Sequence, residues 1–266
     1  MAKIITIANQ KGGVGKTTLT INLGIALSRM GRRVCLIDCD PQANLTMVLG
    51  CHQPDELSVT LSHVMQELIN SNFDIETSEL IQSRGYMLRN QNIDFIPSNI
   101  SLIGIENILV NVMSRENILK IFINSIKNDY DYILIDTMPS LNLITINALN
   151  AADSVLIPMQ PQYLSAKGLE MLLSTIGNIK KVLNPSLEIE GILITMYDNR
   201  LTFHKEIVES MINGFGDRLK IFNTKIPVSV RVTETQARAA SIFDYDPHGK
   251  ISESYENFTK ELINNE

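Results

Sequence analysis

A glycine-rich stretch near the start of the chain, NQKGGVGKTT (9–18), carries the residue types that bind a nucleoside triphosphate. Its glycines let the backbone turn tightly and direct successive N–H groups toward phosphate oxygens. Lys16 is placed to reach the β- and γ-phosphates, and the hydroxyl of Thr17 is placed to coordinate Mg²⁺. The stretch predicted to bind the nucleotide comprises Lys11, Gly12, Gly13, Val14, Gly15, Lys16, Thr17 and Thr18.

The same stretch departs from the usual phosphate-binding pattern, G-x-x-x-x-G-K-[ST], at its first position. That position, six residues before Lys16, holds Gln10 instead of glycine, and an additional lysine, Lys11, follows it. A lysine there adds positive charge about where negative charge builds up on a transferring phosphoryl group. In other nucleoside triphosphatases an arginine finger does this, from the same subunit or from a partner.

Three aspartates follow predicted strands and could complete the site. Asp136 ends the apolar strand YDYILID (130–136), where P-loop enzymes place an acid that holds Mg²⁺, usually through water; the simpler alternative is a strand-terminal cap. Asp38 and Asp40 lie in LIDCDPQANLT (36–46), at the sheet edge where ligands bind. One of them could orient or deprotonate the attacking water, but Asp-Pro is also a common turn pair, and spacing alone leaves the choice open.

Short β-branched runs that alternate with longer helical patterns must position these residues. This alternation indicates βαβ units with right-handed crossovers, and strands that are apolar nearly throughout suit burial on both faces. The predicted fold is an α/β P-loop NTPase, a mostly parallel twisted sheet with helices on both faces, in a single domain over 1–266. We expect strands at 3–9, 33–38, 93–98, 130–136, 154–159, 189–197 and 219–227, helices at 16–30, much of 99–128, 141–151, 164–183 and 201–213, and one or two helices with loops in the polar stretch 51–92.

Composition narrows the class of protein. Lys and Arg number 23 against 29 Asp and Glu, a net charge of −6, which argues against a surface that is basic all over but allows a local basic patch. The cysteines Cys35, Cys39 and Cys51 form no C-x-x-C pair and indicate ordinary side chains in a reduced compartment. No apolar run approaches the roughly 18 residues that span a bilayer, and KIITIAN is too short for a signal peptide. We therefore expect a cytoplasmic protein without a membrane partner.

Five segments follow one another over essentially the whole chain: NQKGGVGKTT, LIDCDPQANLT, YILIDTMPSLNLITINAL, VLIPMQPQYLSAKGLEMLL and SIFDYDPHGKISESYENF. Together they resemble the ParA/Soj family of DNA-partitioning ATPases. The lysine-first loop is the deviant phosphate-binding loop that this family shares with MinD-type division-site regulators and with the nitrogenase iron protein. DCDPQAN and DYDPHGK are narrower motifs and favour ParA.

The resemblance implies an enzyme that hydrolyses ATP with Mg²⁺ and completes its sites as a homodimer. Lys11 corresponds to the signature lysine, which in the family crosses a sandwich dimer to the phosphates of the partner's ATP. Asp40 lies on switch I and assists hydrolysis, and hydrolysis then removes contacts from the dimer interface. The implied catalytic residues are Lys11, Lys16 and Asp40, and the implied residues at the metal are Thr17, Asp40 and Asp136.

The resemblance also implies a base-binding segment and a DNA-binding surface. TMYDNR (195–200) is similar to the segment that approaches adenine, and IPVSVRVTE (226–234) to the segment that lines the base and bears a DNA-contacting arginine. Family members bind double-stranded DNA without sequence preference as ATP dimers on the nucleoid. A ParB-like partner at a centromere-like site stimulates hydrolysis, which segregates plasmid or chromosomal DNA. The implied nucleotide-binding residues here are Met196, Asp198, Pro227 and Val228, and the implied DNA-binding residues are Arg200 and Arg231.

Two positions depart from the family pattern. Met138-Pro139 stands where the family commonly has two prolines after the switch II aspartate, so we expect a looser switch II. Gln162 replaces the glutamate of the family segment QPEY, so the role of that acid does not carry over.

Two other classes of protein have the same kind of loop, and each requires a further sequence feature. A MinD-like membrane-surface ATPase that regulates division-site placement needs a basic amphipathic C-terminus. Here the C-terminal stripe lies opposite an acidic face, which favours docking onto the body of the protein. A redox protein like the nitrogenase iron protein needs cysteines near the switch regions, whereas all three cysteines precede residue 52. The stripe consists of Ile251, Tyr255, Phe258 and Leu262.

Overall fold

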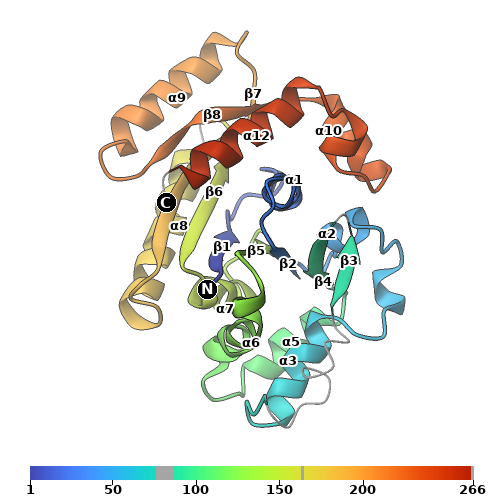
Figure 1. Cartoon of the computed structure of the whole chain (residues 1–266). Helices are drawn as coiled ribbons and strands as arrows, with labels where there is room; N and C mark the ends of the chain where they lie inside the picture. Colours follow the sequence, from blue (N-terminus) through green and yellow to red (C-terminus); the bar gives the residue numbers. More distant parts are fainter. Residues whose placement is uncertain (76–86, 91, 163–164, 265–266) are drawn as a thin grey trace.

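One twisted sheet of eight strands organises the chain in the computed structural model, which describes residues 1–75, 87–90, 92–162 and 165–264 (Figure 1). The strand order is β3-β4-β2-β5-β1-β6-β7-β8, and all these pairings are parallel except that of β3 with β4. The prediction of a mostly parallel α/β sheet is confirmed. The strands are β1 (Lys3–Ile7), β2 (Val34–Cys39), β3 (Leu88–Asn90), β4 (Ile93–Ile96), β5 (Tyr132–Thr137), β6 (Ser154–Met159), β7 (Glu188–Tyr197) and β8 (Ile221–Pro227).

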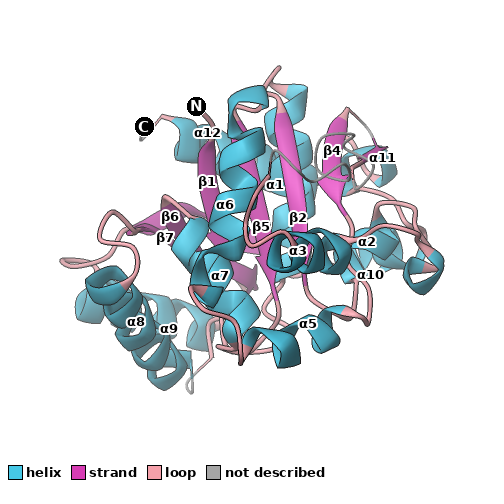
Figure 2. Cartoon of the chain, turned by 90° about the horizontal axis from the view of Figure 1, so that it is seen from below, coloured by secondary structure: helices cyan, strands magenta, loops and turns pink. Residues whose placement is uncertain are grey.

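Helices cover both faces of this sheet, as the connections between parallel strands require. The α-helices are α1 (Lys16–Arg29), α2 (Asn44–Val48), α3 (Leu61–Asn70), α5 (Leu102–Leu109), α6 (Ile118–Ile126), α7 (Leu143–Ala151), α8 (Ser165–Val182), α9 (Thr202–Phe215), α10 (Val230–Ala237), α11 (Ile242–Tyr245) and α12 (Lys250–Ile263). The 3₁₀ helices are η1 (Pro54–Glu56), η2 (Arg115–Asn117) and η3 (Lys127–Asp129). One core holds side chains of α3 and α5 to α9, and the core on the other face holds those of α1, α2, α11 and α12 (Figure 2).

The central strands separate the two cores and bring the predicted site residues to one edge. On β1, Ile4 packs into one core, while Ile5 and Ile7 pack into the other, because alternate side chains of a strand point to opposite faces. β2 and β5 are buried along their whole length. Their parallel register places Asp38 directly beside Asp136, at the carboxyl end of the sheet.

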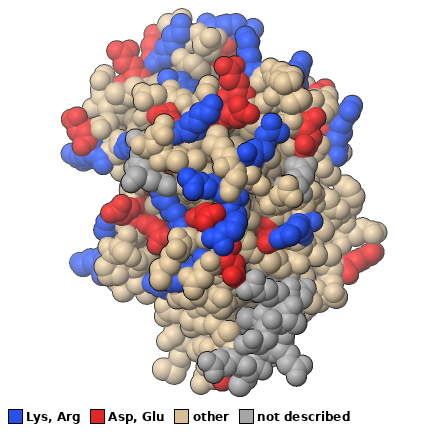
Figure 3. All heavy atoms as spheres, in the orientation of Figure 1, with Lys and Arg blue, Asp and Glu red and all other residues tan. Residues whose placement is uncertain are grey.

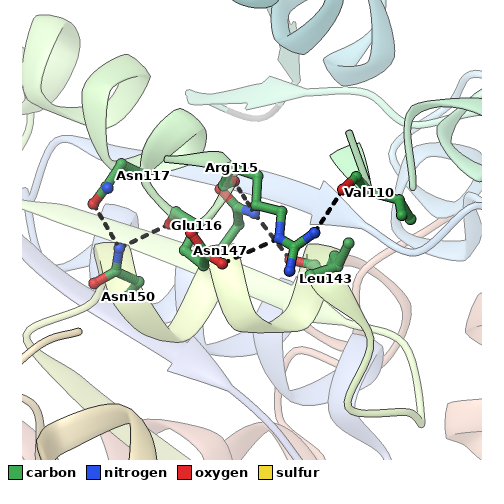
Figure 4. A network of polar contacts seen from close by, with 7 residues as sticks. All are labelled: Val110, Arg115, Glu116, Asn117, Leu143, Asn147 and Asn150. Atoms are coloured by element: carbon green, nitrogen blue, oxygen red, sulfur yellow. Dashed lines mark hydrogen bonds and ion pairs between the residues drawn. The ribbon is translucent and has the colours of Figure 1, made fainter. Parts of the chain in front are cut away.

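The helix predicted over much of 99–128 is interrupted, and the reason is visible in Figure 4. Two buried asparagines of α7 bind the backbone of η2 between α5 and α6. Asn147 Nδ2 donates to the Arg115 carbonyl at 2.9 Å, and Asn150 Nδ2 donates to the Glu116 carbonyl at 2.8 Å. Asn147 Oδ1 also accepts from the Leu119 N–H at 3.2 Å, where α6 begins. Side-chain amides from another element thus satisfy the backbone groups that a continuous helix would have used.

Other differences from the predicted elements lie in polar or short segments. The antiparallel strand β3 falls in the stretch 51–92, for which only helices and loops were expected. Within 226–234 the chain turns into α10, which the sequence did not predict. Residues 76–86 and 91 of the polar stretch, and residue 164 of the predicted helix 164–183, lie outside the described residues.

The C-terminal helix α12 docks onto the sheet, as its apolar stripe predicted. All four residues of the stripe are buried, and Phe258 packs edge-on against Phe222 of β8 with ring centroids 4.9 Å apart. The stripe therefore contributes to a core and is not exposed to solvent. Among the described residues, no helix combines the length and apolarity needed to cross a membrane.

Candidate functional site

The phosphate loop joins β1 to α1 at the carboxyl edge of the sheet. Gly13 and Gly15 have φ angles of 71° and 87°, in the left-handed region that glycine adopts without strain. Gly15 is the N-cap residue of α1 and has no side chain to occupy the first N–H groups of the helix. These groups and the positive end of the helix dipole are therefore available to an anion.

Lys16 lies against this loop and is only 7% exposed. Its Nζ is 3.4 Å from the carbonyl oxygen of Lys11, so the side chain folds back over the loop. Burial lowers the pKa of Lys16, while the charges of Asp136 and Asp40 act in the opposite direction. The cation is thus held between the loop and two carboxylates, where a phosphate would also be placed.

Asp136 is fully buried near the end of β5, and its Oδ2 has no hydrogen-bond partner among the described atoms. Burial, with the charge of Asp38 adding to it, raises the pKa of Asp136 to about 8, and Thr17 acts in the opposite direction. An unsatisfied buried carboxylate oxygen near a threonine hydroxyl suits a hard divalent cation, whose binding would displace the proton. The donors present therefore fit Mg²⁺.

This fit depends on the nucleotide as well as on the protein. Within the described residues, no group of three or more His, Cys, Asp or Glu is arranged to hold a metal ion. Mg²⁺ in nucleotide sites takes one or two protein ligands, with phosphates and water supplying the rest. Thr17 and Asp40 line the cavity and are available for this directly. Asp136 is fully buried and does not line the cavity, so it would act through water.

The structure separates the two aspartates of LIDCDPQANLT. Asp40 lines the cavity beside the loop, is 8% exposed, and accepts a hydrogen bond from the Gln42 N–H at 2.9 Å. Asp38 is fully buried, is not among the residues that line the cavity, and binds backbone and side-chain donors with both oxygens. Burial raises the pKa of Asp38 to about 6. Of the two, only Asp40 is placed to meet a ligand.

A cavity of about 1200 Å³ opens in front of the loop, which is large enough to hold a nucleotide. Val14 of the loop is buried and does not line the cavity, and its carbonyl accepts from Thr195 Oγ1 at 2.8 Å. Asp198 lines an adjoining pocket of about 700 Å³ instead, which shares Pro227 and Val228 with the cavity. The predicted residues that line the cavity are Gly12, Gly13, Gly15, Lys16, Thr17, Thr18, Asp40, Met196, Pro227 and Val228.

Lys11 does not line the cavity of its own subunit. Its Nζ donates to Gln162 Oε1, Gln162 Nε2 donates to Gln160 Oε1 at 2.9 Å, and Gln160 Nε2 donates to the Gly13 carbonyl at 2.7 Å. Two glutamines after β6 therefore hold the phosphate loop. In the sequence, Gln162 stands out only as a departure from a family pattern, and no motif marks Gln160.

Comparison with known proteins assigns the family. A family model described as an AAA domain matches residues 2–189. The sporulation initiation inhibitor protein Soj of Bacillus subtilis (strain 168) is 41% identical over 265 residues, covering 100% of both chains. The chain belongs to the Soj/ParA family of P-loop ATPases.

Solved structures similar to this Soj/ParA-family chain include proteins with bound nucleotide. Cobyrinic acid a,c-diamide synthase from Mycobacterium smegmatis, with bound ATP analogue and magnesium, is 31% identical with a TM-score of 0.83, covering 99% of this chain and 95% of that one. A plasmid partition protein from Borrelia burgdorferi bound to AMPPNP is 26% identical with a TM-score of 0.78, covering 100% of both chains. Because these names differ, the fold by itself does not choose the function.

The two arginines that the Soj/ParA resemblance points to are exposed, and each is paired within the chain. Arg200 donates to both carboxylate oxygens of Asp198, at 2.9 and 2.7 Å. Arg231, on α10, donates from Nη1 to Asp246 Oδ2. Exposed ion pairs contribute little to stability, so a phosphate could compete for either guanidinium. On the face shown in Figure 3, Lys and Arg are interspersed with Asp and Glu, which favours a local contact surface over a uniformly basic one.

Proposed function

We propose that this Soj/ParA-family chain is a Mg²⁺-dependent ATPase that segregates plasmid or chromosomal DNA, with residues 1–266 acting as one domain. Two ATP-bound subunits pair face to face, and the dimer binds double-stranded DNA on the nucleoid without sequence preference. A ParB-like partner at a centromere-like site stimulates hydrolysis and releases the dimer. The observation that carries the proposal is a phosphate loop with one lysine in the cavity and a second outside it, in a chain 41% identical to Soj along its full length.

Different residues of the cavity bind the nucleotide and assist its hydrolysis. The loop glycines and Lys16 hold the phosphates, and Asp40 orients the attacking water by accepting a hydrogen bond from it. Thr17, Asp40 and Asp136 would hold Mg²⁺, which would supply positive charge to neutralise the phosphates. Met196, Pro227 and Val228 line the side that takes the base, and we assign Asp198, in the adjoining pocket, to the outer edge of the base.

Lys11 acts, in this proposal, on the ATP of the partner subunit. Support comes from its position, because it lies outside its own cavity and is held by Gln162. If the Lys11 side chain reaches the ATP of the partner subunit, the triphosphate becomes part of the dimer interface. Loss of the γ-phosphate would then remove contacts from both subunits, which makes dimerisation depend on the nucleotide.

DNA retention measured with ADP, ATP and a slowly hydrolysed ATP analogue tests this function. We expect retention only with the triphosphates. If Arg200 and Arg231 of both subunits each neutralise a phosphate, affinity should fall roughly 100-fold between about 50 and about 200 mM salt, because counterions are released on binding. Equal retention with ADP, or retention that salt leaves unchanged, would contradict the proposal.

Anionic lipid vesicles serve as the comparison surface in the same experiment, since they test the MinD-like alternative. Membrane binding by α12 would require its apolar stripe to leave the core in which it is buried. We therefore expect no ATP-dependent binding to vesicles, and binding there in place of DNA would favour the alternative.

Arg231→Ala is expected to weaken DNA binding by about tenfold or more, and to lower the salt dependence by about two ions per dimer, because each dimer loses two phosphate contacts. ATP-dependent dimerisation should be retained. The measurement is DNA retention and sedimentation with the slowly hydrolysed analogue.

Asp246→Asn is the matched control for this variant. It weakens the pair that Asp246 forms with Arg231 in the free protein but leaves the arginine in place. We expect DNA binding in this control to be unchanged or tighter. If both variants weaken binding equally, the ion pair and not a DNA contact accounts for the effect.

A further inference from the structure

Asp38 joins the two ends of the loop that carries Asp40. Its Oδ1 accepts from the Asp40 N–H at 3.1 Å, where the loop begins. Its Oδ2 accepts from the Thr46 N–H at 3.0 Å and from Thr46 Oγ1 at 2.7 Å, in the first turn of α2, the helix into which the loop leads. Three donors from the two sides of the loop therefore converge on one carboxylate.

Thr46 extends this connection to a second strand. Its Oγ1 accepts from the Ser98 N–H at 2.9 Å, just after β4. β4 lies beside β2, which carries Asp38. All three residues are fully buried, so water does not compete for these bonds. The loop is thus fixed to the ends of two adjacent strands.

The loop itself is held in a conformation that needs such support. Ala43 has a φ of 54°, in the left-handed region that a residue with a Cβ rarely adopts. Its N–H donates to the Asp40 carbonyl at 2.9 Å, so this turn follows directly from the position of Asp40. A strained turn persists only when its surroundings determine it.

The chemistry of residue 38 also points to a clamp. A buried carboxylate beside Asp136 is unfavourable unless donors satisfy it. Asparagine at this position would remove the charge, but only its amide oxygen can accept hydrogen bonds. Its NH₂ group would then face either the Asp40 N–H or the two Thr46 donors, and no hydrogen bond could form there. Three converging donors require a group that only accepts, which a carboxylate provides.

We propose that Asp38 and Thr46 are positioning residues that hold Asp40 in the geometry for hydrolysis without touching the nucleotide. The inference rests on the proposed function, in which Asp40 assists ATP hydrolysis. It assigns to Asp38 a role different from that of Asp40, although the two stand two residues apart.

Thr46→Val tests the clamp, because it keeps the N–H but removes the hydroxyl that links Asp38 to Ser98. Single-turnover hydrolysis per bound ATP is the readout, since it does not depend on the fraction of protein that folds. We expect this rate to fall roughly 10- to 100-fold, as for small misplacements of a catalytic group. The KM for ATP and analogue-dependent DNA retention should change less than about threefold.

Thr46→Ser is the matched control, since serine restores the hydroxyl, and it should recover most of the rate. A Thr46→Val rate per bound ATP that equals the wild-type rate would overturn the inference. If the wild-type protein itself fails to hydrolyse ATP, the proposed function fails instead, so the two failures are distinguishable.

Asp38→Asn provides an independent test, and we expect a larger loss of rate than with Thr46→Val because all three bonds are disturbed. The double variant Asp38→Asn/Thr46→Val should lose little beyond Asp38→Asn alone, because both changes break one unit. Fully additive losses would contradict a shared clamp.

Discussion

Lys16→Ala is expected to abolish ATP-dependent pairing of subunits and retention on DNA together, with ATP affinity lowered at least about 100-fold. The reason is that the lysine supplies the buried cation of the phosphate site, and charge-assisted hydrogen bonds to phosphate are among the strongest that a side chain makes. Lys16 is 7% exposed and lies among the loop, Asp40 and Asp136. Titration with a fluorescent ATP analogue, followed by sedimentation with and without ATP, measures both effects.

Lys181→Ala is the matched control, since Lys181 is exposed on α8, outside the cavity. It should bind ATP and pair like the wild-type protein. Thermal unfolding of both variants without nucleotide separates loss of binding from loss of fold. Wild-type pairing by folded Lys16→Ala protein would show that the triphosphate is not what joins the subunits.

The parts of the fold that sequence predicted are those with a local physical cause. A phosphate loop is specified by Gly13, Gly15 and the lysine that follows. The glycines set the backbone conformation and the lysine sets the charge, all within a few residues. Continuous apolar runs specify strands buried on both faces. The stripe of α12 specifies docking because its spacing matches a helix.

The parts that sequence did not predict depend on contacts between distant residues. The helix is interrupted at η2 because the side chains of Asn147 and Asn150 on α7 form hydrogen bonds with the backbone of η2. The pattern of residues within 99–128 cannot predict contacts with a distant helix. The bond from Lys11 to Gln162 spans 151 residues. The sequence does not distinguish the roles of Asp38 and Asp40, whereas in the structure Asp40 lines the cavity and Asp38 is buried and bonded to donors on both sides of the loop.

The base-binding and DNA-binding residues stay predictions, but the structure sharpens them. Asp198 was assigned to adenine, yet its carboxylate holds Arg200, two residues along the chain, in the adjoining pocket. Because the predicted base-binding residue Asp198 pairs with the predicted DNA-binding residue Arg200, binding of the base and binding of DNA would be coupled. Opposite charges two residues apart in DNR were the sequence signal for this ion pair.

Mixing Lys11→Ala protein with Asp40→Ala protein is expected to restore hydrolysis that neither variant shows alone. Alone, Lys11→Ala should bind ATP but hydrolyse it about 1000-fold more slowly, like loss of an arginine finger. Asp40→Ala should also bind ATP, and its slow hydrolysis should leave a persistent DNA-bound dimer. Normal turnover by Asp40→Ala would remove Asp40 from the mechanism. Phosphate release from each protein and from an equimolar mixture is the measurement.

The expected recovery follows from which subunit supplies each group. In a mixed dimer, the site on the Lys11→Ala subunit keeps its own Asp40 and receives Lys11 from its partner, so it is complete. The other site lacks both groups. With random pairing into symmetric dimers, roughly a quarter of wild-type activity should return. A lysine that served its own site would leave both sites of the mixed dimer incomplete, and no activity would return.

The matched control is the mixture of Lys16→Ala with Asp40→Ala. Lys16 lines the cavity of its own subunit, whereas Lys11 lies outside it and is held by Gln162. Lys16→Ala subunits are not expected to pair on ATP, and any mixed dimer that did form would have one site without Lys16 and one without Asp40, so hydrolysis should stay low. Recovery in the first mixture alone would assign Lys11 to the active site of the partner subunit. Recovery in neither mixture, with Lys11→Ala and Asp40→Ala both binding ATP and sedimenting together as a dimer, would place Lys11 in its own site and exclude a shared one.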